Sequence, residues 1–410
     1  MGQSKSKRPI RVLHCPAMVG GNPQSLARAE RELGLESWAV SFYQSSIGYK
    51  TDEVLWKEGD HPIICEAKRF WLLWRALRHF DIIHFNFGQS ILPHRVDANE
   101  EIKSKFSSWI KQKYYKYPSW IKRVYGFYSS LFELRDLSLL KKAGKGIVVT
   151  YQGDDARQGG YCLDNFEVSP ATEVEPGYYS KESDIYKQNK IKRFASYADR
   201  IYALNPDLLN VLPASARFLP YANVDLREWM PSKKKVSNPR LPVILHAPSH
   251  EGIKGTKYVM DAISRLKAER IPLEFILVEG FSHIEALRLY QQADLLIDQM
   301  LCGWYGGLAV EFMALGKPVI CYIREGDLKF IPEQMRNDLP IINVTPVTLY
   351  NVVKEWLTIR KSEFQETGRR SREYVEKWHD PLRIANQLKK EYQKILATKG
   401  PDDDKDLQNG

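Results

Sequence analysis

The stretch from residue 298 to residue 320, DQMLCGWYGGLAVEFMALGKPVI, constrains the fold more than any other part of this sequence. A short apolar run ends at Asp298 and predicts a buried strand of a parallel sheet. A glycine-containing loop follows, and a helix is expected from about Gly307 to Leu315. Gly316 ends it, because glycine suits the left-handed residue after a helix. Pro318 prevents the helix from continuing, and a second apolar run predicts the next strand. This succession is typical of an α/β domain built on a parallel sheet.

The glycine turn before the helix is a candidate phosphate-binding site. A helix N-terminus presents unpaired backbone N–H groups and the positive end of the helix dipole, and both favour an anion. Glu311 lies one turn further along, at about 6 Å for a rise of about 1.5 Å per residue. A carboxylate there can accept hydrogen bonds from sugar hydroxyls joined to the phosphate. The alternative is a tight strand-to-helix turn with a solvated Glu311, and the residues alone leave both interpretations open.

The same stretch resembles the C-terminal signature of retaining GT-B glycosyltransferases, in particular glycosyltransferase family 4, which commonly reads E-G-F-G-L-x-x-x-E-A-M-A-x-G-x-P-V. Tyr305 and Gly306 match the F-G pair, Glu311 matches the second Glu, and the small residues and proline that follow also match. The first Glu of the family's E-x7-E pattern falls on Gly303, so that carboxylate is missing. Asp298, at the strand end, is a candidate to supply a carboxylate instead.

The resemblance implies a GT-B fold, with two Rossmann-like doubly wound parallel-sheet domains that face each other across a cleft. It also implies a C-terminal helix that crosses back to the first domain. The expected activity is transfer of a sugar from a nucleotide-diphospho-sugar, with retention of configuration, to a glycan or a lipid-linked acceptor such as a surface polysaccharide. No cofactor and no metal are expected, because a Lys and helix N-termini can stabilise the leaving diphosphate. The expected donor-binding residues are Gly20, Gly21, Ser249, Lys254, Gly255, Thr256, Asp298, Tyr305, Gly306, Gly307, Leu308 and Glu311.

A second glycine turn lies near the N-terminus. A predicted strand at 10–14 leads to Gly20–Gly21, and Asn22 and Pro23 are a plausible cap and first residue of a helix that ends before Gly34. The motif is weak by itself, because it lacks the G-x-G-x-x-G spacing of a dinucleotide fold. In the resembled family this turn lies against the donor diphosphate and the transferred sugar.

The loop after a third predicted strand, GIVVT at 146–150, carries polar residues at the sheet edge where open α/β sheets place their sites. Gln152, Asp154 and Arg157 are the expected acceptor-side residues. Asp154 and Asp155 join Glu311 and Lys254 as candidate catalytic residues. Many family members have a His where this chain has Gln152. The alternative for this loop is an ion cluster that satisfies itself.

Lys254 lies between a predicted strand at 243–246 and a helix, in the sequence Lys–Gly–Thr. A lysine beside glycine at the mouth of a helix suits a diphosphate, through one mobile charge and backbone N–H groups. This is not a Walker A loop, because its glycine spacing differs. The family carries R-x4-K here; Lys254 matches the Lys, and Ser249 stands at the Arg position.

Residues 92–134 form an unusual insert in the first half. Between residues 101 and 125, seven Lys or Arg and seven aromatic residues accompany a single Glu. This composition favours contact with an anionic membrane surface. Single-stranded nucleic acid and an ordinary amphipathic hairpin are the alternatives. Further on, residues 160–185 lack periodicity and are expected to form a lid-like loop.

Length and composition indicate the number of domains, the kind of partner and the cellular compartment. The 410 residues, 43% of them apolar, are sufficient for two or three domains. We expect an N-terminal domain at 1–229, a nucleotide-sugar-binding domain at 230–380, a helix at 381–396 and a disordered tail at 397–410. The net charge of +10 favours anionic partners, and five scattered cysteines suit a reducing compartment. We therefore expect a cytoplasmic protein, peripheral on the inner face of the membrane.

Several points stay open from the sequence. Runs of 18 or more apolar residues are missing, and the first six residues match a myristoylation pattern that would carry no meaning in a bacterial cytosol. A GT-B nucleotide-sugar epimerase and a base-modifying glucosyltransferase are alternative functions. A non-catalytic GT-B binding module is another, because Gly303 and Gln152 both depart from the family pattern.

Overall fold

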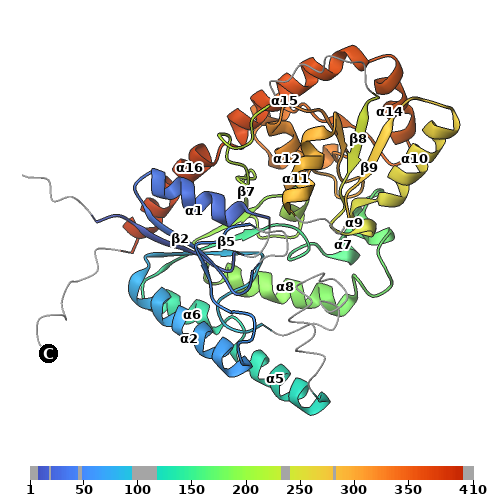
Figure 1. The fold of residues 1–410 in the computed structure, drawn as a ribbon. Coiled ribbons are helices and arrows are strands. Elements are labelled where there is room, and N and C mark those ends of the chain that lie inside the picture. Colours follow the sequence, from blue (N-terminus) through green and yellow to red (C-terminus); the bar gives the residue numbers. More distant parts are fainter. Residues whose placement is uncertain are drawn as a thin grey trace, which may run out of the picture.

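The computed structural model describes residues 8–17, 20–44, 49–94, 118–231, 241–279 and 283–399. In these ranges the chain forms two parallel sheets, each covered by helices on both faces (Figure 1). The first sheet has the strand order β3-β2-β1-β4-β5-β6-β7, and the second has the order β12-β11-β10-β8-β9. Every described strand pair is parallel. The predicted α/β class with two doubly wound sheets is confirmed.

The first sheet is built from the N-terminal half of the chain. Its central strands are mostly apolar and are fully buried, because helices cover both of their faces. The strands are β1 (Arg11–His14), β2 (Glu36–Ser41), β3 (Glu53–Val54), β4 (Ile82–Asn86), β5 (Gly146–Tyr151), β6 (Arg200–Ala203) and β7 (Arg217–Phe218). The helices are α1 (Asn22–Glu32), α2 (Pro62–His79), α5 (Ser119–Phe132), α6 (Arg135–Lys142), α7 (Gly159–Asn165) and α8 (Lys181–Ala195), with 3₁₀ turns η1 (Pro170–Thr172) and η2 (Pro206–Asn210).

The second sheet follows residue 241. Its strands are β8 (Val243–His246), β9 (Glu274–Leu277), β10 (Leu295–Ile297), β11 (Val319–Cys321) and β12 (Ile342–Asn343). Its helices are α9 (Glu251–Lys254), α10 (Thr256–Ala268), α11 (His283–Gln292), α12 (Gly307–Ala314), α13 (Glu333–Asp338), α14 (Leu349–Thr358) and α15 (Phe364–Trp378), with 3₁₀ turns η3 (Glu325–Phe330) and η4 (Lys361–Glu363).

The last helix, α16 (Pro381–Ala397), returns to the first sheet, as predicted (Figure 1). Its apolar side, which includes Leu388 and Tyr392, packs with residues of α1 and of strands β1, β4 and β5. The Tyr392 hydroxyl donates to Glu30 at 3.1 Å and lies 2.8 Å from His84 Nδ1. Because these partners are fully buried, α16 is part of the N-terminal core.

The lid-like loop predicted at 160–185 is wrong in part. This segment contains α7, η1 and the start of α8, and it bridges the two halves of the chain. Glu173 binds Tyr258 of α10, whose hydroxyl donates at 2.8 Å, and Val168 O accepts from Arg324 at 2.8 Å. Apolar periodicity did not predict these helices, because they are short and contact both halves of the chain, so their apolar residues do not lie on one side.

Several predicted features lie wholly or partly outside the described residues. They are the first seven residues with the myristoylation pattern, residues 95–117 of the insert, residues 232–240 of the interdomain segment, and the tail from residue 400. The predicted domain boundary at 229/230 stays a prediction. In the part of the chain that the structure describes, no helix is long and apolar enough to cross a membrane.

Substitution of Leu388 by Ala tests the role of α16. Leu388 is fully buried against the first sheet, so its truncation should lower the free energy of unfolding by about 2–5 kcal/mol. Leu382→Ala on the same helix is the control, because Leu382 is 38% exposed and its loss should cost about 0.5 kcal/mol. Urea denaturation measures both. Equal effects of the two substitutions would contradict this packing.

Candidate active site

The predicted strand–turn–helix is present at the edge of the second sheet that faces the first. β10 ends at Ile297, Asp298 follows, and α12 starts at Gly307 after a loop capped by Gly306. Gly316, with a φ of 71°, follows the end of the helix, as its position in the sequence predicts. The candidate site is organised around Asp298, Gly306 and Glu311.

Asp298 joins the two turns that we expect to bind a diphosphate. Its Oδ2 accepts the Gly306 N–H at 2.7 Å, and its Oδ1 accepts from Lys254 Nζ at 3.0 Å. A Cβ at Gly306 would lie 3.2 Å from Lys254 Nζ, so a side chain there would crowd the ammonium group. Burial lowers the pKa of Lys254, but the carboxylate of Asp298 raises it more, and the net shift is upward. Lys254 therefore remains charged, and its charge is balanced inside the protein.

Glu311 is buried between the two halves of the chain. The residue is only 3% exposed. Its Oε1 accepts hydrogen bonds from the Tyr49 hydroxyl at 3.2 Å and from Asn223 Nδ2 at 3.3 Å. Asn223 Nδ2 also lies 3.1 Å from Gly307 O. Burial raises the pKa of Glu311 to about 7, against the hydrogen bonds from Tyr49 and Asn223, which lower it. The alternative of a solvated Glu311 is wrong.

The N-terminal glycine turn faces this cluster. Gly20 and Gly21 both have left-handed backbone, with φ of 72° and 67°. A Cβ on Gly21 would lie 2.6 Å from the ring of Tyr49, and one on Gly20 would lie 3.7 Å from Gln152 Oε1. The glycine turn, Gln152 and Glu311 are thus brought together, with Tyr49 between the turn and Glu311. Sequence reasoning missed Tyr49, which no motif marks.

The loop after β5 forms the ion cluster that the sequence left as an alternative. Asp154 accepts from Arg157 at 3.0 Å and from the hydroxyls of Tyr178 and Tyr179, and Arg157 also donates to Asp207 at 2.9 Å. Burial raises the pKa of Asp154, but Arg157 and the other donors outweigh it and hold that pKa well below its usual value. These groups satisfy one another, and Gln152 is the residue of this loop that approaches the glycine turn.

Asp155 closes the same loop from within. Its carboxylate accepts the backbone N–H groups of Gln152 and Gly153, at 3.1 and 2.7 Å. Burial raises the pKa of Asp155 to about 6, although those two N–H groups lower it. The observed contacts of Asp155 hold the loop, and its catalytic role stays a prediction.

The other predicted donor-side residues are spread more widely. Tyr305 turns into the second core, where its hydroxyl lies 2.9 Å from the Tyr374 hydroxyl and 2.8 Å from His379 Nε2. Thr256 is buried with its hydroxyl 3.0 Å from His246 Nε2, and Ser249 is exposed. Gly255 joins α9 to α10 with a φ of 72°, and Leu308 packs at the margin of the second core.

Gly303 has a structural reason for its departure from the resembled pattern. Its φ is 78°, and a Cβ there would lie 2.5 Å from Arg324 Nη1. Arg324 is held by Asp327 Oδ2 at 2.9 Å and by Val168 O. A glutamate at this position would therefore collide with a fixed guanidinium. Asp298, the candidate replacement carboxylate, is engaged by Lys254 and Gly306.

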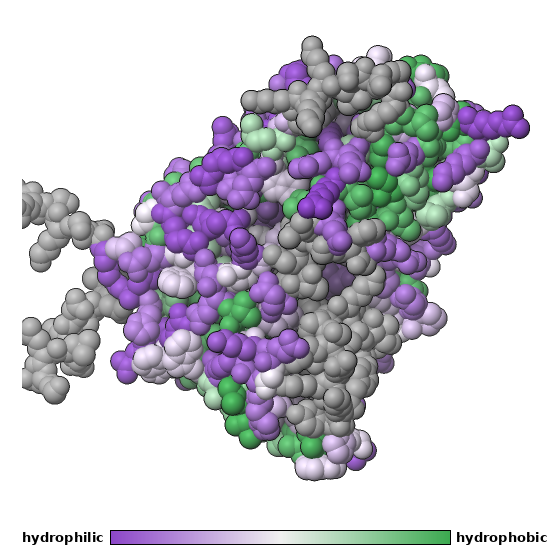
Figure 2. Space-filling model, in the orientation of Figure 1, coloured by the Kyte–Doolittle hydropathy of each residue, from purple (hydrophilic) through white to green (hydrophobic). Residues whose placement is uncertain are grey.

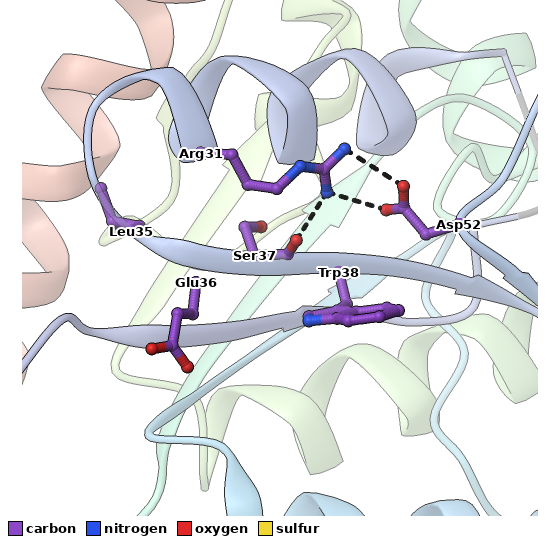
Figure 3. A pocket seen from close by; sticks show the side chains of 6 residues that line it. All are labelled: Arg31, Leu35, Glu36, Ser37, Trp38 and Asp52. Atoms are coloured by element: carbon purple, nitrogen blue, oxygen red, sulfur yellow. Dashed lines mark hydrogen bonds and ion pairs between the residues drawn. The ribbon is translucent and has the colours of Figure 1, made fainter.

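A surface hollow lies apart from the candidate site, and the described residues form no metal-binding cluster. A surface hollow of about 480 Å³ lies over α1 and β2, lined by Arg31, Leu35, Glu36, Ser37, Trp38 and Asp52 (Figure 3). It shares none of these residues with the site, and Arg31 and Asp52 pair with each other there at 3.0 Å. Among the described residues, no group of three or more His, Cys, Asp or Glu is arranged to hold a metal ion, and the five cysteines are buried and free.

The sequence and the structure were compared with those of known proteins. No protein-family model and no curated protein matches the sequence. Sucrose-phosphate synthase from Thermosynechococcus elongatus matches with a TM-score of 0.58 and 14% identity, over 96% of this chain and 100% of that chain. Anabaena Alr3699/HepE, solved with UDP-glucose, matches with a TM-score of 0.56 and 10% identity, over 94% and 100%. A glycosyltransferase from Rickettsia africae matches with a TM-score of 0.54 and 13% identity, over 95% and 99%.

The chain has a GT-B-like fold. In this GT-B-like fold the candidate site lies between the two sheets, where Gly20–Gly21 and Gln152 from the first half meet Glu311 from the second. The strand–turn–helix signature predicted the second half of this site. Asn223 comes from the segment that joins the halves, and Tyr49 comes from the segment before β3.

The ionisation of Glu311 provides a pH test of this burial. Its pKa in the folded state, about 7, lies above the ordinary value of 4.5, so its contribution to stability is present below about pH 4.5 and is lost as the pH rises to about 7. Glu311→Gln removes this titration. Between pH 5 and pH 8, the stability of the variant relative to the wild type should rise by about 2–3 kcal/mol.

Urea denaturation at both pH values measures this change. Glu333→Gln, which removes an exposed carboxylate on α13, is the control and should show no comparable rise. A constant difference between wild type and Glu311→Gln across the pH range would mean that Glu311 is solvated and ionised throughout.

Proposed function

We propose that this protein is a glycosyltransferase that moves a sugar from a nucleotide-diphospho-sugar to an acceptor. One observation carries the proposal: Glu311, one turn into α12, is buried opposite the Gly20–Gly21 turn and on the same edge as Lys254. A carboxylate for sugar hydroxyls, a lysine and a helix N-terminus for phosphates, and a glycine turn that lets a ligand approach are then present in one place. The GT-B-like fold supports the same function.

The donor diphosphate, in this proposal, takes over the contacts that Asp298 makes. Asp298 accepts from Lys254 and from the Gly306 N–H, which are the two groups that suit a phosphate. A diphosphate can accept from both donors and has further oxygens for the first N–H groups of α12. As the bond to the sugar breaks, negative charge grows on the leaving diphosphate. Lys254 and the helix N-terminus stabilise that charge in a site largely closed to water.

Glu311 holds the ribose in this arrangement. The Tyr49 hydroxyl now occupies Glu311 Oε1, so a ribose hydroxyl has to replace Tyr49 as donor. Asn223 bonds both Glu311 and Gly307 O and keeps the carboxylate aligned with the helix start. The transferred sugar then lies toward Gly20, Gly21 and Gln152. Gly20 and Gly21 have no side chains that would crowd its ring.

The acceptor approaches from the loop after β5. Asp154 and Arg157 shape this loop through their closed ion cluster, and Gln152 is the group that they present to the site. The acceptor class is a glycan or a lipid-linked glycoconjugate. Retention of configuration is part of the proposal, and it is supported by the resemblance of residues 298–320 to the signature of retaining enzymes.

A non-catalytic nucleotide-sugar-binding module is the second candidate, and Gly303 favours it. The carboxylate of the resembled pattern is missing there, and the space is filled by Arg324. Release of nucleoside diphosphate separates the two functions. Incubation with UDP-glucose and other nucleotide-sugars should release the diphosphate, slowly even without acceptor. Binding without any release, over a broad set of donors and acceptors, would leave only the binding module.

Lys254 gives a direct test of the phosphate site. Loss of a charge-assisted contact to phosphate costs about 1.5–3 kcal/mol, so Lys254→Met should weaken binding of the nucleoside diphosphate at least tenfold. The substitution also leaves the buried carboxylate of Asp298 without its ion-pair partner, which is destabilising. The double variant Lys254→Met/Asp298→Asn removes both charges and should regain stability without regaining affinity.

Calorimetric titration with UDP measures the affinity, and thermal melting checks the fold. Lys267→Ala, at the exposed far end of α10, is the control for loss of a positive charge. Wild-type affinity in a folded Lys254 variant would place the phosphate elsewhere.

A further inference from the structure

Helices α2 and α5 lie side by side on the first half of the chain, at the lower end of the molecule in Figure 1. The rings of Phe70 and Phe132 meet edge to face with centroids 5.7 Å apart. Glu66 of α2 accepts from the hydroxyls of Tyr125 and Tyr128 of α5, at 3.4 and 2.9 Å. Position 66 pairs with 125 and 128, and position 70 with 132, so the two helices run parallel.

Each helix turns an apolar stripe to the outside. On α2, Ile63, Phe70 and Trp74 follow the spacing i, i+7, i+11, and they are between 38% and 73% exposed. Ile64 and Trp71 extend this stripe, each 48% exposed. An ordinary surface helix turns its polar side outward, so this arrangement is reversed.

The stripe on α5 is more regular still. It has the spacing i, i+4, i+7, i+11, which places its members on one narrow side of the helix. They are between 42% and 68% exposed: Trp120, Val124, Phe127 and Leu131. We call the two stripes together the α2–α5 face. Figure 2 shows some hydrophobic side chains along the lower edge of the molecule, among hydrophilic ones.

The α2–α5 face also carries positive charge. Arg78 lies one turn after Trp74, Arg123 lies one turn after Trp120, and both arginines are exposed. Lys68 of α2 does not add to this charge, because it is half-buried and pairs with Asp60 at 2.5 Å.

The two helices offer almost no negative charge in return. Over their whole length, which the structure describes, their sequences contain a single acidic residue, Glu66. The two tyrosines of α5 already bind that carboxylate. The face therefore combines aromatic and aliphatic side chains with two exposed cations, and neither helix sets an exposed carboxylate beside them.

We propose that the α2–α5 face binds the surface of an anionic lipid bilayer. Two parallel helices with outward apolar stripes present a broad surface, and Trp, Phe and aliphatic side chains can enter the headgroup boundary while the arginines meet anionic lipid. The proposal does not rest on the proposed function, because none of these residues contacts the candidate active site.

The charge of the α2–α5 face favours a bilayer over the other partners that could bind there. A second copy docked through the same face would set two surfaces of the same positive sign against each other, which is repulsive. The segment 95–117 of this chain has more basic than acidic residues, so it is not complementary in charge to the face. Single-stranded nucleic acid would gain stacking from aromatic rings but little from the aliphatic side chains between them.

Vesicle co-sedimentation of the full chain tests the proposal. Vesicles of 70% phosphatidylcholine and 30% phosphatidylglycerol should bind the protein at least tenfold more tightly than pure phosphatidylcholine vesicles. Binding should fall as salt is raised, because salt screens the charges of the arginines. Part of the binding should persist at high salt, because the apolar contact is not screened. Absence of binding to the anionic vesicles overturns the proposal.

An apolar pair of substitutions assigns the binding to this face. Trp74→Ala/Phe127→Ala should weaken binding at least tenfold at every salt concentration. The matched control is Val347→Ala/Ile359→Ala, which truncates two exposed apolar residues on the other half of the chain and should bind as the wild type does.

A charged pair tests the role of the arginines. Arg78→Glu/Arg123→Glu should lower the preference for anionic over neutral vesicles at least fivefold. Lys267→Glu/Arg336→Glu is the matched control, because it reverses two exposed charges on the second half of the chain and should keep the preference.

All the substituted side chains are exposed, so the variants should keep the wild-type melting temperature, and melting curves check this. Wild-type binding by both pairs of variants on the α2–α5 face overturns the assignment. Light scattering and DNA competition decide between occupants. A dimer that dissociates in Trp74→Ala/Phe127→Ala, or displacement from vesicles by single-stranded DNA at matched salt, would assign the face to a second copy or to nucleic acid and overturn the bilayer.

Discussion

His379 links the two places where the chain passes between its halves, the segment at Tyr221 and the segment that leads into α16. Its Nδ1 lies 2.8 Å from Tyr221 O, and its Nε2 lies 2.8 Å from the Tyr305 hydroxyl. Burial lowers the pKa of His379 to about 4, so the neutral ring donates from Nδ1 and accepts from Tyr305 at Nε2. This bond anchors the residue before Gly306 to the interdomain crossing. The Gly306 turn is therefore joined to the interdomain crossing through Tyr305 and His379, and Asp298 accepts the N–H group of the same turn.

The sequence predicted those parts of the molecule that depend on local patterns. Apolar runs with glycine and proline at their ends placed β10, α12 and β11 correctly, because the chemistry that ends a helix acts over a few residues. The crossing of α16 was predicted from resemblance, since nothing within residues 381–396 says which surface covers the apolar stripe. Residues 160–185 were misjudged because their helices are short and their partners, Tyr258 and Arg324, are 85 and 156 positions away from the residues they contact.

The site itself was predicted only in part, for a related reason. A motif shows which residues lie near a turn. The charged side chain that balances a buried charge can come from a distant part of the sequence, because the fold decides which residues are in contact. Lys254 was expected to meet phosphate, and its partner in the structure is Asp298, 44 positions away. Glu311 is held by Tyr49, 262 positions away and outside any motif. The clash of a side chain at Gly303 depends equally on a distant residue, so sequence showed the missing carboxylate without its cause.

The α2–α5 face and the candidate site use different parts of the first half of the chain. α1 and α16 cover one face, where the polypeptide returns from the second half, and α2, α5 and α6 lie on the opposite face (Figure 1). The α2–α5 face is thus formed by helices on the opposite side of the first sheet from α16. The candidate site draws its residues from the turn before α1, the loops after β5 and β10, helices α9 and α12, and the segments at Tyr49 and Asn223, and none of them lies on α2 or α5. A bilayer bound at the α2–α5 face would therefore contact the first half of the chain and none of the residues of the candidate site, because none of those residues lies on α2 or α5.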